Sequence, residues 1–221
     1  HFTEDERRWL DQKYNLCTTA REIGLTSPEV HFIKSKNDLE SFDFNLTKKR
    51  YILKSLAYAP VERLNRPLLP FDGQKLYFNG LEISSERPWV LQEFVSGQEF
   101  CTHSTVHDGR ILLHCCCESS EFQLRYKHVD NQAIYYWVET FVRAMNITGQ
   151  ISFDFIVNER GEVMPIECNP RTHSAITAFY NSECVADSYV ISQGYQSSQI
   201  GPCFPRSVSY THLTLPTTDR V

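Results

Sequence analysis

No apolar run in the sequence approaches the roughly 20 residues that a helix needs to cross a bilayer. Residues 1–20 also lack the basic start and apolar centre of a signal peptide. Basic residues are in deficit, with 22 Lys and Arg against 27 Asp and Glu and a net charge of −5. Because nucleic-acid binders draw affinity from clustered Lys and Arg, we expect neither a membrane nor a nucleic-acid partner.

The eight cysteines include no C-x-x-C pair, which is a spacing typical of zinc and dithiol sites. Three of them form the run Cys115–Cys117 inside an apolar segment. We interpret all eight as buried free thiols, and not as a metal or disulfide framework. Free thiols persist in reducing compartments, so the predicted localisation is the cytoplasm.

Local patterns predict helices that alternate with antiparallel hairpins. A capping box at Thr3–Glu6 predicts a helix over residues 4–23, and Asn37 is expected to cap a helix over 37–43. Residues 57–80 are rich in proline and are expected to form mostly loop. The other expected elements are strands at 30–33, 50–56 and 89–95, a hairpin of 99–107 with 110–117, a helix over 132–145, and a hairpin of 151–157 with 162–168. This order predicts an α+β fold.

The second hairpin carries the most informative side chains. Asp154 lies inside an apolar strand, where an unpaired carboxylate is unfavourable. Glu167 and Asn169 are two residues apart on the facing strand, so the hairpin can bring all three side chains to one face. Such oxygen ligands suit Mg²⁺, and Arg171 follows where it could bind a carboxylate or acyl phosphate. The alternative is an ordinary hairpin with surface carboxylates.

Two earlier segments strengthen this interpretation through their order. The apolar segment 89–95 runs into Ser96-Gly97 and is followed by Glu99, a pattern that a plain turn also explains. Lys54 ends the apolar stretch Tyr51-Ile-Leu-Lys54, where a lysine often only extends its amine towards solvent.

Taken in order, these segments resemble the ATP-grasp superfamily, over roughly residues 10–190. The separation between Asp154 and Glu167 (167 − 154 = 13) is similar to that of the family. The resemblance implies two α+β lobes that hold ATP between antiparallel sheets. It implies that Asp154, Glu167 and Asn169 bind Mg²⁺ or Mn²⁺, and that Asn169 and Arg171 act in catalysis, with Arg171 facing the carboxylate or phosphoryl group.

The resemblance also implies a nucleotide site. The main chain of Glu93 and Val95 would read the edge of adenine, and Gln92 would reach its amino group. Glu99 would accept hydrogen bonds from the ribose hydroxyls, and Lys54 would bind the α- or β-phosphate. Lys13 resembles a residue of the family's entry helix, with a weaker role.

Several positions depart from the family pattern. Arg63 and Arg66 stand where a glycine-rich phosphate loop is usual, and Ser152 stands where many relatives have Arg or Gln. Arg125, Lys127 and His128 are candidates for the missing positive charge. His173 and Ser174 are candidates for the acceptor site.

The implied domains are an N-terminal lid lobe over residues 1–88, incomplete at its start, and a C-terminal lobe with the metal site over 89–206. Residues 207–221 back-translate to a transposase-type sequencing adapter read in frame, and we expect this tail to be non-native. The run Glu167-Cys-Asn-Pro-Arg-Thr-His-Ser174 most resembles the carbamoyl-phosphate-synthase-type branch, which includes mycosporine-glycine synthase-like ligases.

The implied function is a ligase that activates a carboxylate with ATP and passes it to an amine, with small-molecule substrates. The alternatives are a bicarbonate-activating carboxylase or carbamoyl-phosphate-type subunit, and a nucleotide-binding fragment without turnover. A homodimer is the oligomer under consideration.

Overall fold

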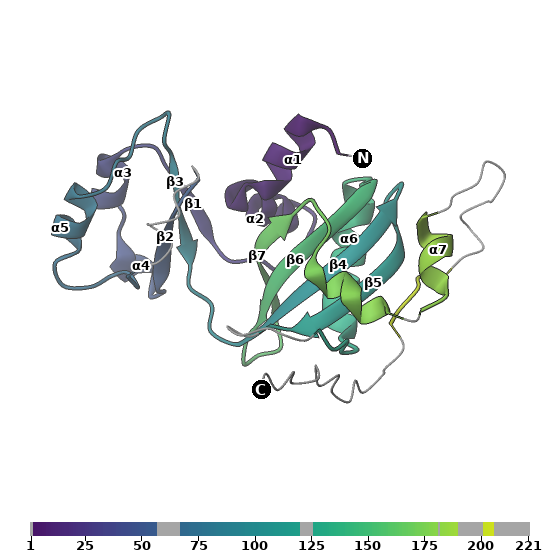
Figure 1. Ribbon diagram of the computed structural model, residues 1–221. Helices are drawn as coiled ribbons and strands as arrows, with labels where there is room; N and C mark the ends of the chain where they lie inside the picture. The colour runs from purple at the N-terminus through teal and green to yellow at the C-terminus, as the bar shows by residue number, and fades with distance from the viewer. Residues whose placement is uncertain (1, 57–66, 120–125, 181, 190–200, 206–221) are drawn as a thin grey trace, which may run out of the picture.

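The computed structural model describes residues 2–56, 67–119, 126–180, 182–189 and 201–205. Two antiparallel sheets organise them (Figure 1). The three-stranded sheet has the order β1-β3-β2, with β1 (Val30–Ile33), β2 (Tyr51–Ser55) and β3 (Trp89–Glu93). The four-stranded sheet has the order β5-β4-β6-β7, with β4 (Gln98–His107), β5 (Arg110–Glu118), β6 (Gly149–Val157) and β7 (Val163–Asn169). The predicted α+β class is confirmed.

The three-stranded sheet forms the small lobe with short helices on one face. These helices are α3 (Lys36–Glu40), α4 (Phe44–Thr47) and α5 (Gln74–Asn79). Each contributes one buried side chain, Leu39, Phe44 and Phe78 respectively, to a core shared with Leu53 and Leu91 of the sheet. Because side chains alternate along a strand, the opposite face of this sheet carries Lys54, Val90 and Gln92.

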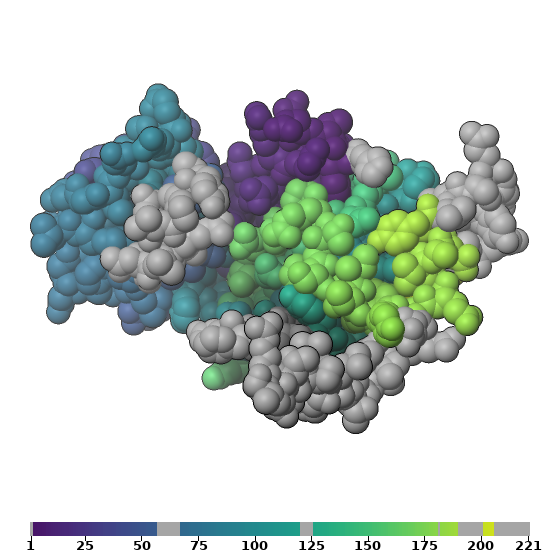
Figure 2. Space-filling view, in the orientation of Figure 1, coloured from purple at the N-terminus to yellow at the C-terminus, as the bar shows by residue number. Residues whose placement is uncertain are grey.

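The four-stranded sheet forms the large lobe and packs one face on helix α6 (Gln132–Ala144), which was predicted. Trp137 and Phe141 of this helix pack edge to face against Phe153 and Phe155 of β6, with ring centroids 5.0–5.4 Å apart. Helices α1 (Glu4–Asp11) and α2 (Lys13–Glu22) join the same core. Figure 2 shows the N-terminal segment, in purple, seated on this lobe.

The predicted helix over residues 4–23 was wrong in its continuity, because extended backbone at Gln12 (ψ 113°) divides it into α1 and α2. The predicted cap Asn37 was also wrong. Ser35 accepts from the Asp38 N–H while the Asp38 carboxylate accepts from the Ser35 N–H, so the helix begins earlier. Helix α5 interrupts the region expected to be loop. In the described part of the chain, none of the helices has the length and apolar character to span a membrane.

The face of the four-stranded sheet away from α6 is covered by the 3-10 helix η1 (Ser174–Phe179) and by α7 (Cys184–Tyr189). Cys184 and Cys203 are joined by a disulfide, which corrects the expectation of eight free thiols. The cause is spatial, because Cys203 pairs with the edge strand β5 beside α7 and its Cα lies 5.8 Å from that of Cys184. The other six cysteines are free and buried.

Two segments cross between the lobes, residues 23–29 before β1 and residues 94–97 after β3. This grouping differs from the predicted division after residue 88. β3 pairs with β1 and β2 because its apolar side chains complete their core, and α1 and α2 pack with the four-stranded lobe. The predicted tail over residues 207–221 lies outside the described residues.

Candidate functional site

The β6–β7 hairpin places three predicted side chains together. Asp154 pairs with Glu167, and Ser152 pairs with Asn169, across the two strands. The neighbouring residues Phe153 and Phe155 point into the α6 core, so Asp154 points to the opposite face. The Asn169 side-chain amide lies 3.4 Å from Asp154 Oδ2. The expected cluster of two carboxylates and one amide is therefore present in the geometry.

Two cations flank this cluster. Lys13 Nζ lies 3.4 Å from Glu167 Oε1, and Arg171 donates from Nη2 to Asn169 Oδ1 at 3.2 Å. Sequence reasoning placed Arg171 here but left Lys13 out of the site, because the contact depends on helix α2 packing against β7. In the sequence, Lys13 is only a single lysine at the start of a mostly polar helix. Such a lysine does not by itself indicate a functional site.

The surroundings of the cluster make the Asp154 carboxyl harder to ionise. Burial and the neighbouring Glu167 carboxylate raise the pKa of Asp154 to about 6, against the opposing influence of Arg171 and Lys13. The two flanking cations thus leave the Asp154 charge incompletely compensated.

These residues fit a hard divalent cation. Mg²⁺ takes one or two protein carboxylates and fills its remaining positions with water and phosphate oxygens. The described ranges contain no group of three or more His, Cys, Asp or Glu side chains arranged for a metal. The donor set is therefore limited to two carboxylates and the Asn169 amide oxygen, which suits Mg²⁺ better than an all-protein site for zinc.

The small lobe presents Lys54 and Gln92 on the face away from its core. Gln92 is 1% exposed, and its Oε1 has no hydrogen-bond partner among the described residues. A buried acceptor without a donor is unfavourable, so a ligand donor would relieve it. Lys54 is 7% exposed and lies opposite Val90.

Helix α2 connects the two sheets. Cys17 of this helix packs with Val90 of β3, the residue that pairs with Lys54 of β2. Lys13, one helical turn earlier, contacts Glu167 of the other sheet. The structure thus relates Lys54 to the Asp154–Glu167 cluster through one face of α2.

The predicted adenine segment lies in the crossing from β3 to β4. The Glu93 N–H donates to the Glu29 carbonyl at 2.8 Å, so this N–H is already paired within the protein. Glu99 is exposed on β4 and pairs with Ile156 of β6. Val95 and Glu93 line a pocket of about 390 Å³ together with Met164 of β7.

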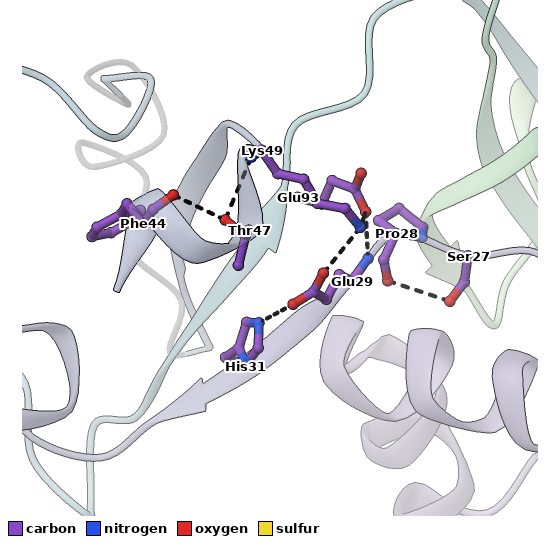
Figure 3. Close-up of polar contacts among 8 residues, drawn as sticks. All are labelled: Ser27, Pro28, Glu29, His31, Phe44, Thr47, Lys49 and Glu93. Atoms are coloured by element: carbon purple, nitrogen blue, oxygen red, sulfur yellow. Dashed lines mark hydrogen bonds and ion pairs between the residues drawn. The ribbon is translucent and has the colours of Figure 1, made fainter. Parts of the chain in front are cut away.

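A cluster of charged side chains lies where β3 ends and this crossing begins (Figure 3). Lys49 Nζ lies 3.0 Å from both Glu29 Oε2 and Glu93 Oε2, and the Glu29 N–H donates to Glu93 Oε2 at 3.0 Å. His31 Nε2 lies 2.6 Å from Glu29 Oε1. Burial works against the Glu29 carboxylate, yet the hydrogen bonds from Lys49 and His31 lower its pKa overall. The cluster therefore joins the crossing segment 23–29 to the end of β3, where the second crossing segment begins.

Other candidates are only partly brought to the site. His173 follows Arg171 closely, and its N–H lies 3.4 Å from Nδ1 of the buried His103, a residue that sequence reasoning missed. His128 accepts from the Cys116 N–H at the β5 edge, across the sheet from β7. Lys127 is its neighbour. Arg63, Arg66 and Arg125 lie outside the described residues.

No family model matches the chain, and no curated protein matches its sequence. Solved structures match its fold. N5-carboxyaminoimidazole ribonucleotide synthetase (purK, ADP complex) gives a TM-score of 0.61 at 10% identity, covering 78% of this chain and 48% of that chain. An L-amino acid ligase from Bacillus licheniformis gives 0.53 at 17%, covering 77% and 43%. The ATP-grasp ligase PsnB, with its precursor peptide and AMPPNP, gives 0.54 at 15%, covering 76% and 52%.

The chain spans about half the length of these matched chains. It has the ATP-grasp fold, as the resemblance in its sequence implied.

Proposed function

We propose that this chain, with its ATP-grasp fold, supplies the nucleotide and metal half of a ligase that activates a carboxylate with ATP and transfers it to an amine. The observation that carries the proposal is the β6–β7 hairpin, where Asp154 faces Glu167 with Asn169 and Arg171 beside them. A partly buried pair of carboxylates without full compensation is unfavourable in a purely structural hairpin, and a phosphate-bound divalent cation would offset its charge.

The nucleotide lies between the sheets in this proposal. The unpartnered Gln92 Oε1 accepts from the adenine amino group, while the Glu93 carbonyl and the Val95 N–H meet the edge of the base. Glu99 accepts from the ribose hydroxyls, and Lys54 neutralises phosphate charge. The pocket at Glu93, Val95 and Met164 has the apolar and polar lining that suits a base.

Mg²⁺ or Mn²⁺, when bound, would neutralise charge on the ATP phosphates and orient them. Asp154, Glu167 and Asn169 would hold it. Because Lys13 and Arg171 already contact two of these ligands, they keep the side chains ordered without the metal and are poised to contact phosphate oxygens.

Arg171 has the role closest to the chemistry. The substrate carboxylate attacks the γ-phosphate, ADP leaves, and Arg171 stabilises negative charge on the acyl phosphate. The amine then forms the new bond to the acyl carbon, and phosphate leaves. Phosphoryl transfer of this kind depends on positioning and electrostatics, which is what the residues of the hairpin provide.

A bicarbonate-activating reaction is the second candidate. It is favoured by the match to carboxyaminoimidazole ribonucleotide synthetases, which recur among the structural neighbours. The same ATP and metal residues serve both reactions, since bicarbonate is itself activated at the γ-phosphate. For the whole protein, the proposal includes small-molecule carboxylate and amine substrates and a homodimeric assembly.

The test measures ATP binding by calorimetry, and phosphate release with a panel of carboxylates, bicarbonate and amines. We expect Mg²⁺-dependent ATP binding that Asp154→Asn and Glu167→Gln weaken by about tenfold or more, and that the exposed control Glu183→Gln leaves unchanged. Phosphate release stimulated by one carboxylate with an amine supports the ligase, and stimulation by bicarbonate supports the second candidate. ATP binding without any release leaves a nucleotide-binding fragment, and a folded chain that binds no ATP overturns the proposal.

A further inference from the structure

A larger pocket lies at the N-terminal end of the chain, away from the nucleotide site. It has a volume of about 570 Å³ and is lined by the first residues of the chain, by helix α1, by the β4–β5 turn and by residues 145–148. Figure 1 shows the N-terminus beside the tip of the four-stranded sheet and the end of α6. The nearest residue of β6 is Gly149, five residues before Asp154, which corresponds to about 17 Å along a strand.

The walls of this pocket are held in place by packing. Gly149 has a φ of 148°, and a Cβ there would lie 2.8 Å from the Phe2 ring. Glycine thus allows Phe2 to pack directly on the start of β6. The Thr3–Glu6 capping box fixes the first turn of α1, and Leu10 anchors that helix in the core. The cavity is therefore bounded by ordered elements on both sides.

The lining combines apolar surface with one sign of charge. Phe2, Trp9, Met145 and Ile147 supply the apolar part, and no Lys, Arg or His side chain is among the lining residues that the structure describes. Trp9 is 36% exposed, in contrast to Trp89 and Trp137 at 2% each. An indole face that is open to a pocket is a good surface for an organic cation.

Three carboxylates complete the lining. Glu6 is held by the Thr3 N–H at 2.7 Å, and Asp108 accepts from Thr148 Oγ1 at 3.1 Å. Asp5 makes no hydrogen bond or ion pair within the described residues. His107 lies 3.4 Å from Asp108 Oδ2, and the positive charge of the chain's N-terminus acts on Glu6. The pocket is thus complementary to a ligand with an apolar body and a positive end.

We propose that this pocket binds a small organic cation, an amine with an aromatic or aliphatic body. The ammonium lies between Asp5 and Asp108 and over the Trp9 ring, and the body packs against Phe2, Met145 and Ile147. Small-molecule sites of this size are mostly apolar with a few fixed polar groups, and this pocket has that composition. The proposal is independent of the ligase reaction.

Calorimetry with three matched probes tests it: phenethylamine, 2-phenylethanol and 3-phenylpropionate. The probes share a phenylethyl body and differ in charge. We expect phenethylamine to bind about tenfold more tightly than the alcohol, and the carboxylate to bind most weakly. Tryptophan emission should change on binding, because Trp9 is the exposed indole.

The variant Asp5→Asn/Asp108→Asn removes the two charges proposed to hold the ammonium and keeps the shape, since Asn tolerates the positive φ of 46° at position 108. It should bring the affinities for amine and alcohol within about twofold of each other, while Asp187→Asn on the distant α7 retains the tenfold preference. Trp9→Leu should weaken amine binding and leave the weak alcohol binding in place. Equal affinity of the wild-type chain for all three probes, or no binding of any, overturns the proposal.

Discussion

Two pairs of carboxylates in this molecule face each other across neighbouring strands. Their surroundings shift the pKa of one member in opposite directions. Glu29 and Glu93 share Lys49 at 3.0 Å, and the pKa of Glu29 is lowered despite burial. Asp154 and Glu167 have Lys13 at 3.4 Å from Glu167 alone, and the pKa of Asp154 is raised to about 6. At Glu29 the hydrogen bonds from Lys49 and His31 outweigh burial, whereas at Asp154 burial and the Glu167 carboxylate outweigh Arg171 and Lys13.

Under the proposed function, this contrast separates a structural cluster from the one that would hold the metal. A perturbed pKa by itself marks either kind of site. The direction of the shift decides here, because an acid that folding makes harder to ionise lowers stability near neutral pH. Such a cost is explained if binding energy at the site compensates for it.

The largest expected effect is on the unbalanced pair. Asp154→Asn should reduce the kcat/KM for ATP-dependent ligation by about 10³-fold or more, because it removes charge needed where phosphate is transferred. The measurement is phosphate release with the productive substrate pair. Lys49→Met, at the balanced pair, should reduce it by less than about tenfold. Equal losses in the two variants would remove the functional distinction between the pairs.

The next effect concerns the joint between the two regions. Gly97 is the last residue of the crossing segment 94–97. A Cβ at this position would lie 2.1 Å from the Val157 carbonyl oxygen at the end of β6. Its φ of 157° is also unfavourable for other residues. Gly97→Ala should lower the free energy of unfolding by about 2–4 kcal/mol, measured by urea denaturation. Gly161→Ala is the control, because its positive φ of 77° is strained but no atom lies within 4 Å of its Cβ.

The sequence predicted much of the β6–β7 hairpin but little of the charged cluster of Lys49, Glu29 and Glu93. Asp154, Glu167 and Asn169 are close in sequence, and strand alternation is enough to align them. Lys49 meets Glu29 and Glu93 from 20 and 44 residues away, so its role depends on sheet order. A short-range pattern does not encode that order.

The same reason explains the other misses. Lys13 reaches Glu167 only after α2 packs on β7, and the disulfide of Cys184 with Cys203 depends on where the chain returns to β5. The unpartnered Gln92 Oε1 became visible only when its burial was known. Elements with strong local signals, such as the hairpin turn at Asp108-Gly109, were predicted within a residue or two.

The third prediction reverses the sign of the first. Without nucleotide or metal, Asp154→Asn should raise the free energy of unfolding at pH 7 by about 1–3 kcal/mol, because the wild-type carboxylate must ionise in an unfavourable place. Between the unfolded value of 3.8 and the folded value of about 6, the folded wild-type state binds more protons. Its stability therefore falls as pH rises through this window, and the advantage of the variant grows from pH 4 to pH 7. Urea titrations at both pH values measure it, and destabilisation at pH 7 would contradict it.

The smallest effect is expected at the balanced pair. Lys49→Met leaves Glu29 beside Glu93 without their shared cation, but Lys49 is 41% exposed, so solvent screens the repulsion. We expect a loss of about 1 kcal/mol in the free energy of unfolding at pH 7. The loss should shrink as pH falls, because protonation of Glu29 removes its repulsion with Glu93. The double variant Lys49→Met/Glu29→Gln should recover most of it, because one carboxylate alone has no like charge to repel. A double variant no more stable than Lys49→Met would mean that lysine packing, and not charge balance, holds the two crossing segments together.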